Sequence, residues 1–186
     1  METFFQIDGN ILLWIQENIR NPLLNPVMKA ITHLGDAGIF WILLTVILLC
    51  FKKTRRVGIV SALALILSLV VNNLCLKNLV DRTRPYELIE GLKILVAKPA
   101  DASFPSGHSR ASFAAATAIF PWVPRRYGVP LLILAALIAL SPLYVGVHFP
   151  TDVLAGTVIG ILLGLAANGI FRCWENKGVR EKGDDL

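Results

Sequence analysis

Three short motifs of this chain carry the residue types that could do chemistry. They are a lysine and an arginine seven residues apart, a Pro-Ser-Gly-His tetrapeptide, and a histidine followed four residues later by an aspartate. In chain order these motifs contain Lys77, Arg84, Ser106, Gly107, His108, His148 and Asp152. Cations, a hydroxyl and two histidines around one point suit an anion, and phosphate best. Because ionisable groups are costly in an apolar chain near a bilayer, they indicate a functional site.

The first motif supplies positive charge. If Lys77 and Arg84 lie on one continuous helix, they share a face and can reach a common point, and Pro85 then ends that helix. On such a helix, Arg82 points elsewhere. A guanidinium gives bidentate contacts to phosphoryl oxygens, whereas an ammonium acts as a point charge. The alternative for this motif is a basic loop end at the lipid headgroups.

The second motif precedes an apolar run, which predicts a helix that begins there. A helix N-terminus offers backbone N–H groups and the positive end of the helix dipole to an anion. Gly107 lets the backbone approach the anion closely, and Ser106 can cap the helix or donate its hydroxyl. His108 beside an anion could act as a general acid. The alternative is a capped helix with an incidental histidine.

The third motif lies in a short turn between two apolar runs. Pro150 and Thr151 mark the start of the second run. Asp152 can accept a hydrogen bond from one ring nitrogen of His148, which leaves the lone pair of the other nitrogen free to attack phosphorus. The alternative is a histidine at the membrane interface, next to an aspartate that merely begins a helix.

The rest of the chain has the composition of a membrane protein. Of its 186 residues, 55% are hydrophobic and 17% are charged, and the mean hydropathy is +0.63. The net charge is +5, but the basic residues lie between apolar runs and do not form one stripe. This pattern argues against nucleic acid as a partner and indicates basic loops at a membrane.

The apolar runs predict an all-α fold, a polytopic membrane bundle of about six helices in one domain that covers residues 1–186. Five runs predict spans and a weaker sixth precedes them: 38–51, 57–76, 109–123, 129–147, 153–171 and, with less apolar character, 23–34. Residues 1–21 predict an amphipathic interfacial helix that is retained in the mature chain. Residues 173–186 predict a mobile, charged cytoplasmic tail.

Basic residues predict the orientation of the bundle. They follow the first strong span, separate the third from the fourth, and follow the last: Lys52, Lys53, Arg55, Arg56, Arg125, Arg126, Arg172, Lys177, Arg180 and Lys182. If these residues face the cytoplasm, alternate crossings place all three motifs on the non-cytoplasmic face of a bacterial cell (inner) membrane. Gly156, Gly160 and Gly164 predict close helix packing, either within the fold or across a homodimer.

Taken in order, the three motifs resemble those of the type 2 phosphatidic acid phosphatase superfamily of membrane phosphatases, over about residues 50–172. The resemblance implies a six-helix membrane fold, no metal or other cofactor, and a phosphohistidine intermediate. It implies that His148 attacks phosphorus, that Asp152 orients His148, and that His108 protonates the leaving oxygen. The equatorial oxygens would be held by Lys77, Arg84, Ser106 and Gly107. Undecaprenyl pyrophosphate, phosphatidylglycerophosphate and phosphatidic acid all fit as substrates.

One position departs from this resemblance. Pro142 follows Ser141 where the superfamily has an arginine. Losing one donor to the transition state commonly costs about 10²–10³ in rate. Arg110 lies four residues after Ser106 and could supply the missing charge, whereas its alternative is an arginine that snorkels to the membrane surface. Without compensation, the alternative function is a low-turnover protein that binds or transports a lipid phosphate.

Overall fold

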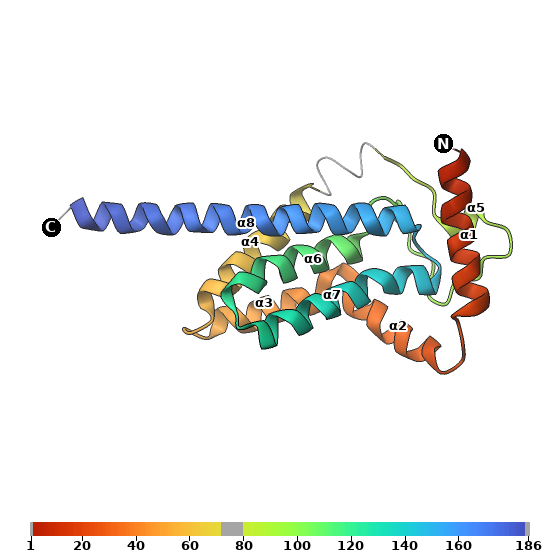
Figure 1. The fold of residues 1–186 in the computed structure, drawn as a ribbon, viewed down its shortest axis with the longest axis horizontal. Coiled ribbons are helices and arrows are strands. Elements are labelled where there is room, and N and C mark those ends of the chain that lie inside the picture. The colour runs from red at the N-terminus through yellow and green to blue at the C-terminus, as the bar shows by residue number, and fades with distance from the viewer. Residues whose placement is uncertain (1, 72–79, 185–186) are drawn as a thin grey trace.

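The computed structural model of this chain is a bundle of helices, crossed at one end by the N-terminal helix (Figure 1). The structure describes residues 2–71 and 80–184, with side chains for 5–71 and 80–176. The helices are α1 (Glu2–Asn18), α2 (Leu24–Gly35), η1 (Asp36–Gly38), α3 (Ile39–Cys50), α4 (Arg55–Val71), α5 (Pro85–Leu88), α6 (Gly107–Ile119), η3 (Phe120–Trp122), α7 (Arg125–Val145) and α8 (Pro150–Asp184). The predicted all-α fold is confirmed.

Three helical segments of the described residues are long and apolar enough to cross a membrane: Leu24–Cys50, Arg125–Val145 and Pro150–Asn176. The first of them joins α2 to α3 through η1, where Ala37 and Gly38 adopt left-handed backbone with φ of 51° and 71°. The weak run at 23–34 is therefore helical, but it continues into α3 as one kinked segment. The 17-residue α4 and the 13-residue α6 are shorter, and they pack against the longer helices.

Helix α6 occupies the middle of the bundle, where it packs against α4, α7 and α8. Its alanines Ala114, Ala115 and Ala118 are fully buried. The glycines of α8 lie directly on α6: a Cβ on Gly160 would lie 2.5 Å from the Arg110 carbonyl oxygen. Gly156 and Gly164 meet the neighbouring turns of α6 in the same way. The glycine repeat therefore packs inside the fold and is no argument for a homodimer.

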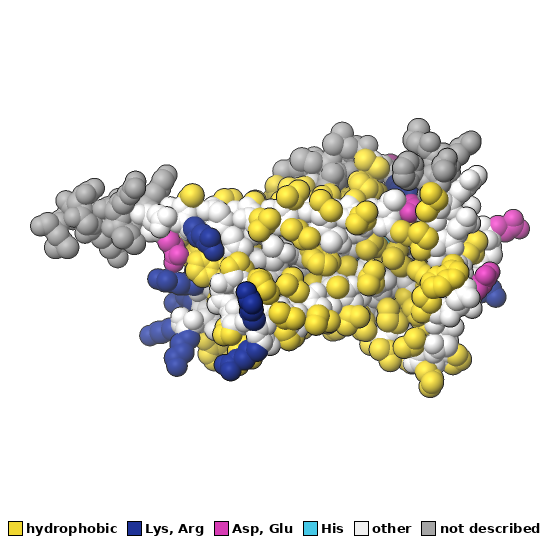
Figure 2. Space-filling view, in the orientation of Figure 1, with side chains coloured by type: hydrophobic (Ala, Val, Ile, Leu, Met, Phe, Trp, Pro, Cys, Tyr) yellow, Lys and Arg dark blue, Asp and Glu magenta, His cyan; other side chains and the backbone are white. Residues whose placement is uncertain are grey.

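Most of the exposed lysines and arginines among the described residues gather at one end of the bundle (Figure 2). They come from the α3–α4 turn, the start of α7 and the far part of α8: Lys52, Lys53, Arg55, Arg56, Arg125, Arg126 and Arg172. Between the two ends the surface is largely apolar, as expected for a surface that faces lipid. The α6 N-terminus and the α7–α8 turn lie at the opposite end (Figure 1). The basic loops thus share one end, as predicted, while the side of the membrane that this end faces stays a prediction.

Helix α1 lies across the end of the bundle that carries the motifs (Figure 1). It buries Asp8 and Leu12 against the other helices, and it exposes Ile7, Ile11 and Trp14. A helix that exposes apolar side chains at the end of a membrane bundle fits the predicted interfacial position. At the other terminus, α8 continues as helix to Asp184, through the residues predicted to form a tail. The mobility of that tail stays a prediction.

Candidate active site

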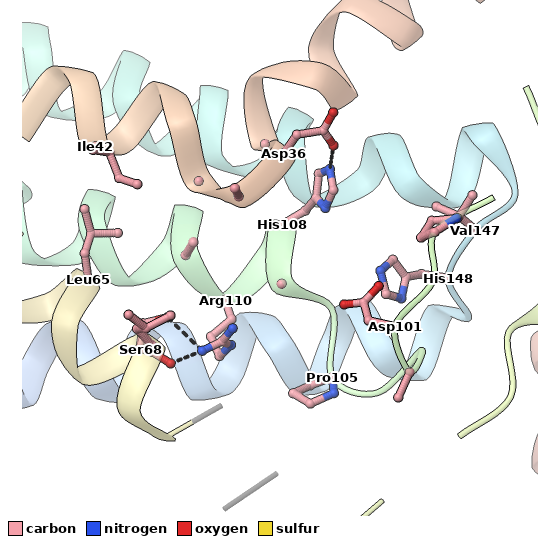
Figure 3. Close-up of a pocket in the computed structure, with 18 of the residues that line it drawn as sticks. Asp36, Ile42, Leu65, Ser68, Asp101, Pro105, His108, Arg110, Val147 and His148 are labelled. Carbon is pink, nitrogen blue, oxygen red and sulfur yellow. Dashed lines mark hydrogen bonds and ion pairs between the residues drawn. The ribbon is translucent and has the colours of Figure 1, made fainter. Parts of the chain in front are cut away.

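A cavity of about 590 Å³ reaches from the α7–α8 turn, along the start of α6, to the apolar side chains of α3 and α4. Its wall includes Arg84, Gly107, His108 and His148, so the structure brings together four of the seven predicted site residues (Figure 3). Ser106 and Asp152 lie directly behind this wall, and their backbones are joined by a hydrogen bond from Ser106 N to Asp152 O of 3.1 Å. Lys77 lies outside the described residues.

Asp152 and His148 form the pair that their spacing predicts. Asp152 Oδ2 lies 3.6 Å from His148 Nδ1, and it accepts hydrogen bonds from the Ser103 hydroxyl at 2.5 Å and from the Phe149 N–H at 3.0 Å. Both side chains are buried, with 0% exposure for Asp152 and 5% for His148. The carboxylate therefore lies beside Nδ1, and Nε2 is the ring nitrogen left for chemistry.

The buried position of His148 also sets its protonation state. His148 belongs to the turn between the α7 and α8 spans. Burial lowers the pKa of its imidazole, and the positive charge of Arg84 acts in the same direction, against the opposing effect of Asp152. The imidazole is therefore neutral at pH 7, and the lone pair of Nε2 is available.

Arg84 approaches the same nitrogen from another segment. Its Nη1 lies 3.5 Å from His148 Nε2 and donates to the Val147 carbonyl oxygen at 2.8 Å. Nε and Nη2 donate to the backbone and the carboxylate of Asp101 at 2.8 and 2.7 Å. These bonds hold the buried guanidinium beside the nucleophilic atom, where it can bind a phosphoryl oxygen.

The predicted helix through the first motif is wrong for its described part. Residues 80–84 are not helical, Arg84 has extended backbone, and Pro85 begins the short helix α5 instead of ending a helix. Arg82 therefore does not point away from the site, as a continuous helix would have placed it. Its Nη1 lies 2.5 Å from Asp152 Oδ1, and its Nη2 lies 2.9 Å from Asp8 Oδ2. Arg82 thus fixes the second oxygen of the carboxylate that orients His148.

The second motif begins α6 as predicted. Ser106 is the N-cap residue, and its hydroxyl oxygen accepts the Ser109 N–H at 3.5 Å. The helix starts at Gly107, where a Cβ would meet no atom within 4 Å, so the first turn of the helix opens onto the cavity. The backbone N–H groups of Gly107 and His108, the first two helical positions, precede any acceptor within the helix and can bind an anion. A contact from the Ser106 hydroxyl to phosphate stays a prediction.

His108 is held from the opposite side of the cavity. Its Nε2 lies 3.2 Å from Asp36 Oδ1 and 3.0 Å from the Thr32 carbonyl oxygen, while its other ring nitrogen lies away from Asp36 (Figure 3). The rings of His108 and His148 are 6.5 Å apart between centroids. Gly35 makes this approach possible, because a Cβ there would clash with His108 Cδ2 and with Ile138.

Sequence reasoning missed Asp36, Ser103 and the true position of Arg82. The Gly35–Gly38 break was a usable signal for Asp36, because two left-handed residues turn the chain toward α6 directly after it.

Pro142, which stands where the resemblance predicts an arginine, is buried within α7. Arg110 does not snorkel: it is only 6% exposed and forms part of the cavity wall.

Comparisons with known proteins give this geometry a context. Residues 57–176 match the PAP2 superfamily. The chain is 33% identical to an undecaprenyl-diphosphatase of Sulfolobus acidocaldarius over 137 residues, which are 74% of this chain and 66% of that protein. It is 31% identical to an undecaprenyl-diphosphatase of Bacillus subtilis over 144 residues, 77% of this chain and 73% of that one.

A solved structure is similar over most of the fold. It is the crystal structure of a transmembrane PAP2 type phosphatidylglycerolphosphate phosphatase from Bacillus subtilis. The TM-score is 0.74 at 31% sequence identity, and the alignment covers 89% of this chain and 84% of that chain.

Proposed function

The chain belongs to the PAP2 superfamily and is a phosphatase of that type for lipid phosphates, and we propose that it works through a phosphohistidine on Nε2 of His148. One observation carries the proposal: in a single cavity, Asp152 lies beside Nδ1 of a buried histidine while Arg84 lies 3.5 Å from its Nε2. A neutral, oriented imidazole next to a fixed cation is what attack on a phosphoryl group requires.

In the first step, the Nε2 lone pair of His148 attacks phosphorus. The P–N bond forms as the bond from phosphorus to the leaving oxygen breaks, and that oxygen takes a proton from His108. Asp152 stabilises the positive charge that develops on the His148 ring. Arg84, Lys77, the Ser106 hydroxyl and the N–H groups from Gly107 onward would hold the equatorial oxygens, so that positioning and charge stabilisation account for most of the rate.

In the second step, water hydrolyses the phosphohistidine. His108, now neutral, takes a proton from the water as its oxygen attacks phosphorus, and the P–N bond breaks. Inorganic phosphate leaves, and His148 is neutral again. Asp36 acts here as a positioning residue, because it holds Nε2 of His108 and leaves the other ring nitrogen for both proton transfers.

The substrate is a lipid whose headgroup reaches the end of the bundle with the motifs. Ile42, Leu65, Ile66 and Leu69 form the far wall of the cavity and suit an apolar tail. Undecaprenyl diphosphate, phosphatidylglycerophosphate and phosphatidic acid are the candidates, and the relatives named above act on the first two. The basic loops at the opposite end support an active site on the non-cytoplasmic face of a bacterial cell membrane.

Pro142 supports a second candidate function. Without the arginine of the superfamily at this position, the cavity could bind a lipid phosphate with little turnover, as in a binding or transport protein. Measured turnover separates the two candidates.

The test is phosphate release from the three candidate lipids by the purified protein in lipid nanodiscs, with His148→Ala beside it. We expect release from the wild type and, in the variant, a loss of at least about 10³-fold, because the nucleophile is gone. Thermal unfolding of both proteins checks that the variant is folded. Release that survives in folded His148→Ala would overturn the mechanism, and lipid binding without release by the wild type would favour the second function.

A further inference from the structure

Arg110 occupies a position in the cavity that the proposed mechanism does not use. At one end of the cavity lies His148, and at the other lie the apolar side chains of α3 and α4, Ile42 and Leu65 among them (Figure 3). Arg84 lies beside His148, with its Nη1 3.5 Å from His148 Nε2. The guanidinium of Arg110 lies between these two ends, against Ser68 of α4. It is therefore on the lipid side of the atom that attacks phosphorus.

The guanidinium of Arg110 is buried without a full set of partners. Its Nη1 donates to the carbonyl oxygen and to the hydroxyl of Ser68, but Nε has no hydrogen-bond partner among the described residues. No carboxylate in the part of the chain that the structure describes forms an ion pair with it. A buried cation of this kind is costly unless an anion completes it.

Two of the other arginines at this end of the bundle, the ones nearest to the proposed nucleophile, provide a contrast; Arg20, which donates to the carbonyl oxygens of Tyr144 and Lys93, does not line the cavity. Arg84 is paired with Asp101, and Arg82 is paired with both Asp8 and Asp152. Their charge is balanced by the protein itself. Arg110 is only 6% exposed, lines the cavity and lacks such a carboxylate. The geometry thus indicates that the counter-ion of Arg110 is part of the substrate.

We propose that Arg110 binds the second, non-reacting phosphoryl group of a lipid diphosphate and so makes the enzyme selective for diphosphates over monophosphates. This inference rests on the proposed function. When His148 attacks the terminal phosphorus, the second phosphoryl group lies between the reacting phosphorus and the tail, which is where Arg110 lies. A monophosphate places only the ester end of its tail there.

Arg110 then also assists the departure of the leaving group. The bond between the terminal phosphorus and the bridging oxygen breaks, the electron pair stays on that oxygen of the lipid monophosphate, and the proton of His108 moves to it. Because bond breaking runs ahead of the proton transfer, the leaving group carries more negative charge in the transition state than in the bound substrate. A guanidinium beside it stabilises this charge most at that moment, so its loss lowers kcat as well as raising KM.

The test compares two substrates with one tail: a polyprenyl diphosphate and the polyprenyl monophosphate of the same length. The proteins are the wild type, Arg110→Gln, Arg110→Lys and the control Arg126→Gln, whose arginine is exposed at the far end of the bundle. In Arg110→Gln we expect kcat/KM for the diphosphate to fall about 10²-fold, while that for the monophosphate changes less than about threefold. Arg110→Lys restores part of the loss, and Arg126→Gln behaves as the wild type.

Retained turnover of the monophosphate shows at once that Arg110→Gln is folded and that the His148 chemistry is intact. An equal loss on both substrates would overturn the inference, because Arg110 would then serve the reacting phosphoryl group or the fold. No loss on the diphosphate, or a wild type that does not hydrolyse it, would overturn the inference as well. Failure of the proposed function is separate, since it shows as monophosphate turnover that persists in His148→Ala.

Discussion

The two histidines of the cavity face each other but are held in different ways. His148 and its partner Asp152 are buried, with side-chain exposures of 5% and 0%, and Ser103 and Arg82 fix the carboxylate. His108 is 17% exposed, and its partner Asp36 is 56% exposed. One pair is enclosed except where His148 borders the cavity, whereas the other borders solvent.

This difference matches two different tasks. A nucleophile has to present one nitrogen in one protonation state, and a buried frame enforces that state. A general acid has to give up a proton and regain one in each turnover, which requires a path to water. The comparison teaches that the carboxylate partner decides the role of a histidine. A buried, fixed carboxylate favours a nucleophile, and an exposed carboxylate favours an acid.

The largest expected effect comes from the enclosed pair. Asp152→Asn keeps the shape of the side chain but removes the negative charge beside Nδ1, so that the tautomer with its lone pair on Nε2 loses its support. We expect kcat to fall about 10³-fold, by analogy with the aspartate of a serine protease triad. Steady-state phosphate release measures this, with thermal unfolding as the folding control. A loss below about tenfold would mean that Asp152 does not orient the nucleophile.

A smaller effect is expected from the solvent-bordering pair. Asp36→Asn keeps a hydrogen-bond acceptor near His108 but removes the charge that favours the protonated acid, so we expect kcat/KM for an alkyl phosphate to fall about tenfold. p-Nitrophenyl phosphate is the matched substrate, because its leaving group departs without a proton, and here the loss should be under about threefold. Equal losses on the two substrates would contradict a role for Asp36 in general acid catalysis.

The smallest expected effect concerns the wild type: the acidic limb of its plot of kcat/KM against pH is shifted to lower pH. Only neutral His148 attacks, and burial puts its pKa below the ordinary value of 6.5. The decline of kcat/KM that reports protonation of His148 is therefore centred below 6.5, whereas the decline at higher pH reports the loss of the proton that His108 has to donate. Initial rates between about pH 4.5 and 8 give the acidic limb, which reports groups of the free enzyme. An acid limb centred above 6.5 would contradict the enclosed, neutral state of His148.

Much of the site could be predicted from the sequence because its parts are local. The spacing of His148 and Asp152 places both at one turn, and the Pro-Ser-Gly-His tetrapeptide marks the start of α6. The apolar runs likewise predicted the helices, because their length and composition hardly depend on their neighbours. What these features share is that a few adjacent residues determine them.

The rest depends on contacts between segments that are distant in the chain. Arg82 was misplaced because helical spacing was extended through residues 80–84, which are held in a non-helical path by bonds to Asp8 and Asp152. Asp36 joins the site only because Gly35 lets α2 approach His108. The glycines of α8 could not be assigned to the fold until their distances to α6 were known.

The most direct test of the account is to identify the residue that carries the phosphoryl group during turnover. Rapid quenching with p-nitrophenyl phosphate, followed by peptide mass spectrometry under alkaline conditions, captures the intermediate. His108→Ala should accumulate it, because this leaving group departs without a proton while hydrolysis lacks its base. The account predicts a phosphoryl group on His148, absent from His148→Ala. A phosphoryl group on another residue, or turnover by His148→Ala without an intermediate, would contradict it.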